Sequence, residues 1–170
     1  MKKYLLFFSL IIGSGIHSQP SVKVFGFEQE SSPGTVATNV KDENGNPIKK
    51  AAIQKHYFIY LTVKQKHRLI PNQVFINGKG FSVETNVVDK TPVVRVNNNI
   101  PDRPEQTILV PRTNNKVFEL TIADPFPVEK TSTLQQLTTK NQVVIAYTWK
   151  EKKYFAVLKK LKKLDPALNE

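Results

Sequence analysis

The sequence contains no cysteine, and this absence removes several kinds of chemistry at once. A chain without thiols forms no disulfide framework, thiolate zinc site or iron–sulfur cluster, and it has neither a cysteine nucleophile nor a cysteine for a bacterial lipoprotein anchor. Acidic residues are also scarce, with 14 Asp and Glu against 25 Lys and Arg, so the net charge is +11. The fold must therefore be stabilised by its apolar core, and its surface is strongly basic.

Histidine, the usual general base near neutral pH, is nearly absent beyond the N-terminus. His56 lies at the start of a strand-like stretch, and we interpret it as a residue that packs or caps a strand end. His67 lies between Lys66 and Arg68 and reads as a solvated turn residue. The chain has no H-E-x-x-H pair, no G-x-S-x-G elbow and no phosphate-binding glycine loop. We therefore predict no catalytic, cofactor-binding or metal-binding residue, and no enzyme activity.

One segment resembles the start of a calcium loop. The run 42–46 (DENGN) places oxygen ligands at the first, third and fifth positions. The loop also needs glycine at the sixth position and a bidentate glutamate at the twelfth. Pro47 and Ile53 occupy these positions, so the segment is interpreted as a turn around Asn44 and Gly45.

The N-terminus has the pattern of a secretory signal. Two lysines precede the apolar run 4–12, which is followed by the small residues of 13–18. This run is shorter than the about 20 apolar residues of a membrane-spanning helix. We predict a signal peptide over 1–18, with cleavage after Gly15 as the alternative, and no transmembrane span after cleavage. The mature protein is then expected in the periplasm or outside the cell, which disfavours nucleic acid as its partner.

Beyond residue 20, apolar residues alternate with polar ones and are interrupted by Asn, Gly and Pro. This pattern is typical of antiparallel β-structure. The stretch 51–64 is apolar on both faces, which predicts a central strand. The pair Asn77-Gly78 predicts a hairpin turn, because both positions require a positive φ.

Three further assignments complete the predicted order. Strands over 107–110 and 117–122 are expected to form one hairpin, and strands over 143–149 and 154–158 another. The stretch 128–142 reads as a long polar connection. The total of about seven to nine strands predicts an all-β, antiparallel two-layer β-sandwich of immunoglobulin-like type, with a closed β-barrel as the alternative. The predicted domain covers 19–158 and is followed by a basic tail over 159–170.

The C-terminal region concentrates lysine. Leucines recur every three residues from Leu158 to Leu164, which predicts a short basic amphipathic helix ended by Pro166. Such a helix either attaches to an anionic surface or docks its leucines on the domain and leaves its lysines in water. The candidate residues for binding an anionic surface are Lys152, Lys153, Lys159, Lys160, Lys162 and Lys163.

These observations favour an exported, non-enzymatic interaction or accessory module of a bacterial-type cell envelope. Its partner would be an envelope protein or an anionic lipid or polysaccharide surface, and no cofactor is expected. The first alternative is a carrier of small hydrophobic ligands, whose barrel cavity would be lined by Phe58, Tyr60, Phe81, Phe118, Tyr147 and Trp149. The second alternative is a hydrolase, which would use the carboxylates of Glu84 and Glu119 or of Asp102 and Glu105.

Overall fold

The computed structural model describes residues 19–32, 53–97, 105–128 and 131–168. The predicted signal peptide 1–18, the oxygen-rich run 42–46 and Asp102 lie outside these residues. Within the described parts the chain forms ten strands and one helix, so the all-β prediction is confirmed. The helix found there is neither long nor apolar enough to cross a membrane.

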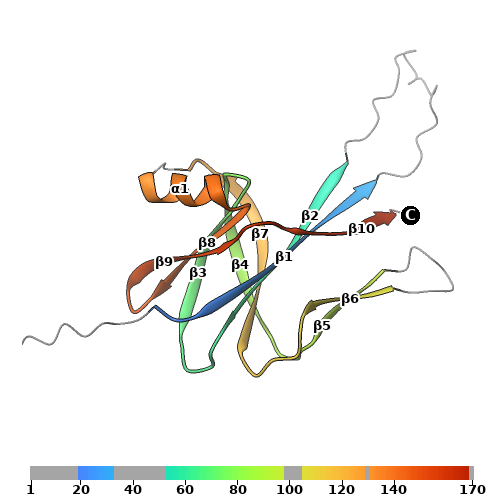
Figure 1. The fold of residues 1–170 in the computed structure, drawn as a ribbon, viewed down its shortest axis with the longest axis horizontal. Coiled ribbons are helices and arrows are strands. Elements are labelled where there is room, and N and C mark those ends of the chain that lie inside the picture. Colours follow the sequence, from blue (N-terminus) through green and yellow to red (C-terminus); the bar gives the residue numbers. More distant parts are fainter. Residues whose placement is uncertain (1–18, 33–52, 98–104, 129–130, 169–170) are drawn as a thin grey trace, which may run out of the picture.

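Eight strands form one curled sheet in the order β10-β1-β2-β7-β4-β3-β8-β9 (Figure 1). The remaining two strands form a separate hairpin, and the helix lies near one end of the sheet. The strands of the sheet are β1 (Val22–Ser32), β2 (Gln54–Val63), β3 (Leu69–Ile76), β4 (Lys79–Val88), β7 (Lys116–Phe126), β8 (Val143–Trp149), β9 (Lys152–Leu158) and β10 (Lys162–Leu168). The hairpin comprises β5 (Val93–Asn97) and β6 (Glu105–Val110), and the helix is α1 (Ser132–Lys140).

The inner face of the curled sheet is filled by one apolar cluster. Alternate residues of β2, namely Ile59, Leu61 and Val63, are fully buried in it. The curl brings β9 close to β1, because a Cβ added to Gly26 would lie 2.7 Å from a methyl carbon of Leu158. Glycine at this position therefore lets β1 approach β9, the strand at the far edge of the sheet.

The outer face is covered in two places by different elements. The β5–β6 hairpin buries Leu109 and Val110 against outer residues of β1, β2 and β7, including Tyr60. Helix α1 buries Leu134 against Phe75 of β3 and against outer residues of β8. These two covers explain why β2 and β8 are apolar on both faces.

Several local predictions are confirmed. Strand β2 lies between β1 and β7, as expected of a strand with two apolar faces. Asn77 and Gly78 have φ values of 49° and 76° and join β3 to β4 in a two-residue turn. Strands β8 and β9 also form the expected hairpin.

The prediction of a basic C-terminal helix is wrong. Residues 162–168 form strand β10, which pairs in parallel with β1. Leu158 and Leu161 pack in the inner cluster while Leu164 packs on the outer face, so the three leucines form no single stripe. A two-turn helix is marginal by itself, and pairing with the free edge of β1 satisfies more backbone groups. Pro166 lies at an irregularity of this edge strand, where a missing N–H is tolerated.

Two other assignments also need correction. Strand β6 pairs with β5 and not with β7, because both edges of β7 are occupied by β2 and β4. The connection 128–142 contains helix α1, which begins after Thr131. The Thr131 hydroxyl accepts a hydrogen bond from the backbone N–H of Leu134, which satisfies one of the free donors at the helix start.

Candidate anion-binding site

Four connections meet at one end of the sheet. They are 64–68 between β2 and β3, 89–92 between β4 and β5, 111–115 between β6 and β7, and 150–151 between β8 and β9. Antiparallel pairing brings them together, since Val63 is opposite Lys116 and Leu69 is opposite Trp149. We call residues 22–23, 64–68, 89–92, 111–116 and 150–152 the turn end.

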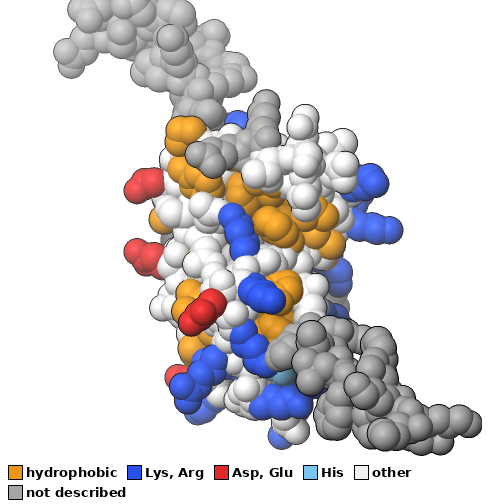
Figure 2. All heavy atoms as spheres, turned by 90° about the vertical axis from the view of Figure 1, so that its left-hand side faces the viewer, with side chains coloured by type: hydrophobic (Ala, Val, Ile, Leu, Met, Phe, Trp, Pro, Cys, Tyr) orange, Lys and Arg blue, Asp and Glu red, His pale blue; other side chains and the backbone are white. Residues whose placement is uncertain are grey.

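The turn end is strongly cationic. It holds nine basic residues and only two acidic ones, Asp89 and Glu151. The rest of the described chain holds nine basic and seven acidic residues, so the excess charge lies mainly at this end. Figure 2 shows Lys and Arg side chains gathering in the lower half of the face that contains β9. The nine basic residues are Lys23, Lys64, Lys66, Arg68, Lys90, Arg112, Lys116, Lys150 and Lys152.

A polar hollow of about 370 Å³ lies between three of these connections. His67, Arg68 and Lys116 line it, together with one acidic residue, Asp89. Thr91 joins two of the connections, because its hydroxyl donates to the carbonyl of Thr113 (3.1 Å) and accepts from the N–H of Thr113 (3.0 Å). The hydrogen bonds of Thr91 therefore hold two of the connections that line the hollow together, and its basic residues outnumber its acidic one.

Aromatic contacts fix the positions of two turns relative to each other. The ring of His67 lies edge-on to that of Trp149, with 5.7 Å between ring centroids. The ammonium of Lys150 lies 4.8 Å from the centre of the Trp149 ring, at a distance typical of a cation–π contact. Trp149 itself is only 7% exposed and packs against Tyr154. The turns that carry Lys66 and Lys150 are thus held by one buried ring.

The β8–β9 turn is strained. Its central residues Lys150 and Glu151 have φ values of 47° and 64°. Residues with a Cβ adopt this region at a cost of about 1–2 kcal/mol each. The matching turn between β3 and β4 uses Asn77 and Gly78, which adopt it more easily. The charged residues Lys150 and Glu151 therefore occupy turn positions at which Asn and Gly would cost less backbone strain.

The six lysines predicted from the sequence do not form one surface. Lys152 belongs to the turn end, and its neighbour Lys153 points to the opposite face of β9. Lys159 and Lys160 lie between β9 and β10, while Lys162 and Lys163 lie on β10. The ammonium of Lys162 is 5.9 Å from the ring centre of Phe27 on the outer face.

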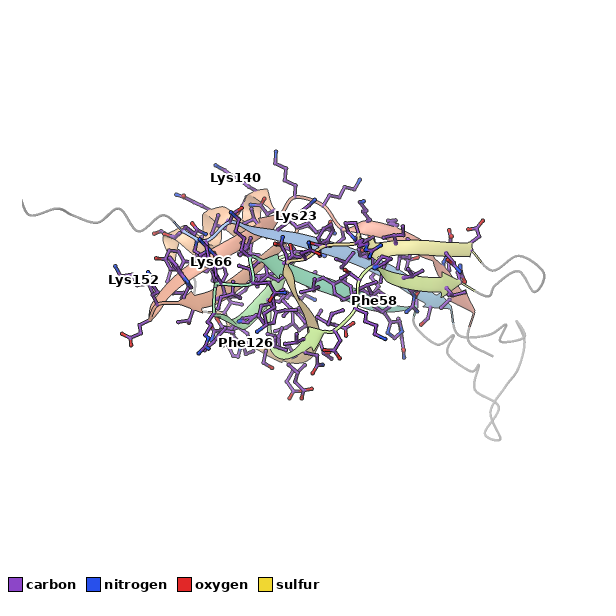
Figure 3. All side chains as sticks on the ribbon, turned by 90° about the horizontal axis from the view of Figure 1, so that it is seen from below. Lys23, Phe58, Lys66, Phe126, Lys140 and Lys152 are labelled. Carbon is purple, nitrogen blue, oxygen red and sulfur yellow. The ribbon has the colours of Figure 1, made fainter. Side chains whose placement is uncertain are left out.

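The cluster at the turn end was missed from the sequence, although its run 64–68 (KQKHR) is visible there. Figure 3 labels Lys66, from the connection between β2 and β3, and Lys152, the first residue of β9, which lie on the same side of the molecule. The basic run 64–68 is the feature of the sequence that points to this site. Its proximity to Lys116 and Lys150 could not be predicted, because it depends on which strands pair.

The residues named for the alternative functions have other contacts. His56 lies near the start of β2, with its Nε2 atom 3.2 Å from the Ser31 hydroxyl. Glu119 accepts a hydrogen bond from the Tyr60 hydroxyl (2.9 Å). Burial first, and this bond second, raise the pKa of Tyr60 well above its usual range. Glu84 is exposed on β4, and Glu105 is exposed at the start of β6.

The six aromatic residues proposed to line a cavity divide between the two faces of the sheet. Phe81, Phe118, Tyr147 and Trp149 belong to the inner cluster. Phe58 and Tyr60 belong to the outer face under the β5–β6 hairpin. In the described part of the chain no group of three or more His, Asp or Glu side chains is placed to hold a metal ion.

Comparison of the chain with protein-family models, with curated proteins and with solved structures finds no match.

Proposed function

We propose that the protein is an exported, non-enzymatic binding module of a bacterial-type cell envelope, and that its turn end attaches to an anionic lipid surface. The observation behind this proposal is the imbalance of nine basic to two acidic residues at one end of the sheet. Anionic headgroups attract such residues with about 1 kcal/mol for each Lys or Arg near the surface. Several positive side chains on a rigid end act together on a planar array of phosphates.

The strained turn supports this assignment. Lys150 and Glu151 are less favourable in their backbone conformation than Asn and Gly would be. Unfavourable backbone conformations are concentrated at functional sites, where the surrounding structure maintains them. The cationic groups also come from four connections and surround an end of the sheet. This arrangement suits a planar surface better than a single polymer chain.

For the architecture we propose a sandwich-like arrangement, in which β10-β1-β2-β7 and β4-β3-β8-β9 face each other across the inner cluster. The support is that this cluster draws residues from both halves of the strand order. A closed barrel would require β9 to form hydrogen bonds with the opposite edge of the sheet, which β10 and the start of β1 provide.

Sedimentation of the mature protein expected after cleavage, residues 19–170, with lipid vesicles tests the proposed attachment. We expect binding to vesicles containing phosphatidylglycerol, little binding to purely zwitterionic vesicles, and a loss of binding at high salt. The triple variant Lys64→Gln, Lys66→Gln, Arg68→Gln should weaken binding by up to about 150-fold, which corresponds to about 1 kcal/mol for each charge.

A second triple variant is the matched control. Lys159→Gln, Lys160→Gln and Lys163→Gln remove the same charge from the predicted tail, away from the turn end. This control should weaken binding by less than about fivefold, because charges beyond about 10 Å are largely screened. An equal or larger loss in the control would show that the tail or the net charge is responsible. Binding to a soluble acidic polysaccharide but not to vesicles would replace lipid with polysaccharide as the partner.

A further inference from the structure

A pocket lies on the outer face of the sheet beneath helix α1, apart from the turn-end hollow. Its volume is about 290 Å³, close to the lower end of the range of small-molecule sites. Residues of β3, the end of β7, the start of α1 and β9 surround it. Phe126, which lines it, is labelled in Figure 3.

The wall of this pocket combines apolar side chains with the polar residues Gln73 and Thr131. Phe75 and Phe126 meet edge to face, with 6.0 Å between ring centroids, and form one side. Phe155, Val128 and Leu134 form much of the remainder. These apolar side chains can pack against an aliphatic or aromatic group of a ligand that also has a polar end.

The pocket also has one charged lining residue among those described. Lys153 borders it, and its ammonium lies 5.7 Å from the ring centre of Phe155. Side chains alternate along β9, so Lys153 and Phe155 share the outer face while Lys152 and Tyr154 share the inner one. None of the described lining residues is acidic. The local charge therefore complements a ligand with one negative group.

We propose that this pocket binds a small amphipathic carboxylate, with its apolar chain between Phe75, Phe126 and Leu134 and its carboxylate beside Lys153. A methylene group fills about the same volume as a water molecule, about 30 Å³. The pocket thus accommodates a chain of up to about eight or nine carbons. This binding does not depend on the proposed lipid attachment, because the pocket and the turn end share no residue.

NMR titration of the full chain with octanoate tests the proposal. We expect saturable shifts of the methyl signals of Val128 and Leu134. Octan-1-ol, which has the chain but no charge, should bind about three- to tenfold more weakly, and octylammonium more weakly still. Comparable binding of octan-1-ol and octanoate would overturn the role of Lys153.

Two pairs of variants sharpen the test. Lys153→Gln should reduce octanoate binding about three- to tenfold and leave octan-1-ol binding unchanged, whereas Lys152→Gln should change neither. Val128→Phe should fill the pocket and reduce octanoate binding at least tenfold. Val157→Phe adds the same bulk at an exposed position on the same face of β9 and should have no effect.

Two results would overturn the proposed binding of a carboxylate in this pocket. One is the absence of a saturable shift at Val128 and Leu134, and the other is an equal loss of octanoate affinity in the Lys153 and Lys152 variants. Each leaves the vesicle experiment unaffected, so the two proposals fail separately. Retained octanoate binding in the Lys64, Lys66, Arg68 triple variant would further separate the pocket from the turn end.

Discussion

Replacing Leu161 with alanine should destabilise the protein by about 3–4 kcal/mol. The side chain is only 3% exposed and belongs to the inner cluster. Losing three carbon atoms costs about 0.8 kcal/mol each in transfer free energy, or about 2.4 kcal/mol, and the remaining cavity adds to this. Gly26 lies beside this leucine and has no side chain that could fill the space. The cavity should therefore collapse poorly.

Urea unfolding of the full chain, followed by the fluorescence of Trp149, measures this change as a shift in midpoint at constant slope. Leu164→Ala is the matched control, because Leu164 is only partly buried and lies on the outer face. It should cost about 1 kcal/mol. A loss of less than about 1 kcal/mol for Leu161→Ala, or equal losses for both variants, would refute the packing described for the residues before β10.

Two further changes have defined outcomes. Because the pKa of Tyr60 is raised in the folded protein, the folded state keeps a proton above pH 10 that the unfolded state loses. The free energy of unfolding should therefore fall above pH 10 by about 1.4 kcal/mol per pH unit. Tyr60→Phe should remove this part of the slope when urea unfolding is measured at alkaline pH. The double change Lys150→Asn, Glu151→Gly should relieve about 1 kcal/mol or more of backbone strain and so raise the melting temperature. The opposite exchange in the β3–β4 turn, Asn77→Lys with Gly78→Glu, should lower the melting temperature. A melting temperature unaffected by both exchanges would contradict the turn argument.

Local sequence patterns predicted the elements whose structure depends on neighbouring residues. The Asn77-Gly78 turn and the apolar faces of β2 are properties of short segments, and both are confirmed. The identity of strand partners is not local. The alternation in β6 suits pairing with β7 as well as with β5, and only the occupied edges of β7 decide between them.

The C-terminal leucines illustrate the same limit. Leucines spaced by three residues would form a stripe along a helix. The segment after Leu161 is nevertheless a strand, because it pairs with the free edge of β1. Helix α1 was missed because its Thr- and Gln-rich sequence offers only Leu134 and Leu137 as apolar anchors. The candidate site was missed because the run 64–68 meets Lys116 and Lys150 only after the sheet has formed.

The parallel pairing of β1 with β10 also affects the order in which the molecule can fold. Phe27 lies opposite Lys162, so the first of the described strands pairs with the last of them. Contacts between residues so distant in sequence form slowly, because a long loop must close before they add stability. While the chain is being synthesised, β2 can pair with one edge of β1, but the other edge remains open. An open strand edge is a site of aggregation, and it is protected here only after the final residues of β10 have been made.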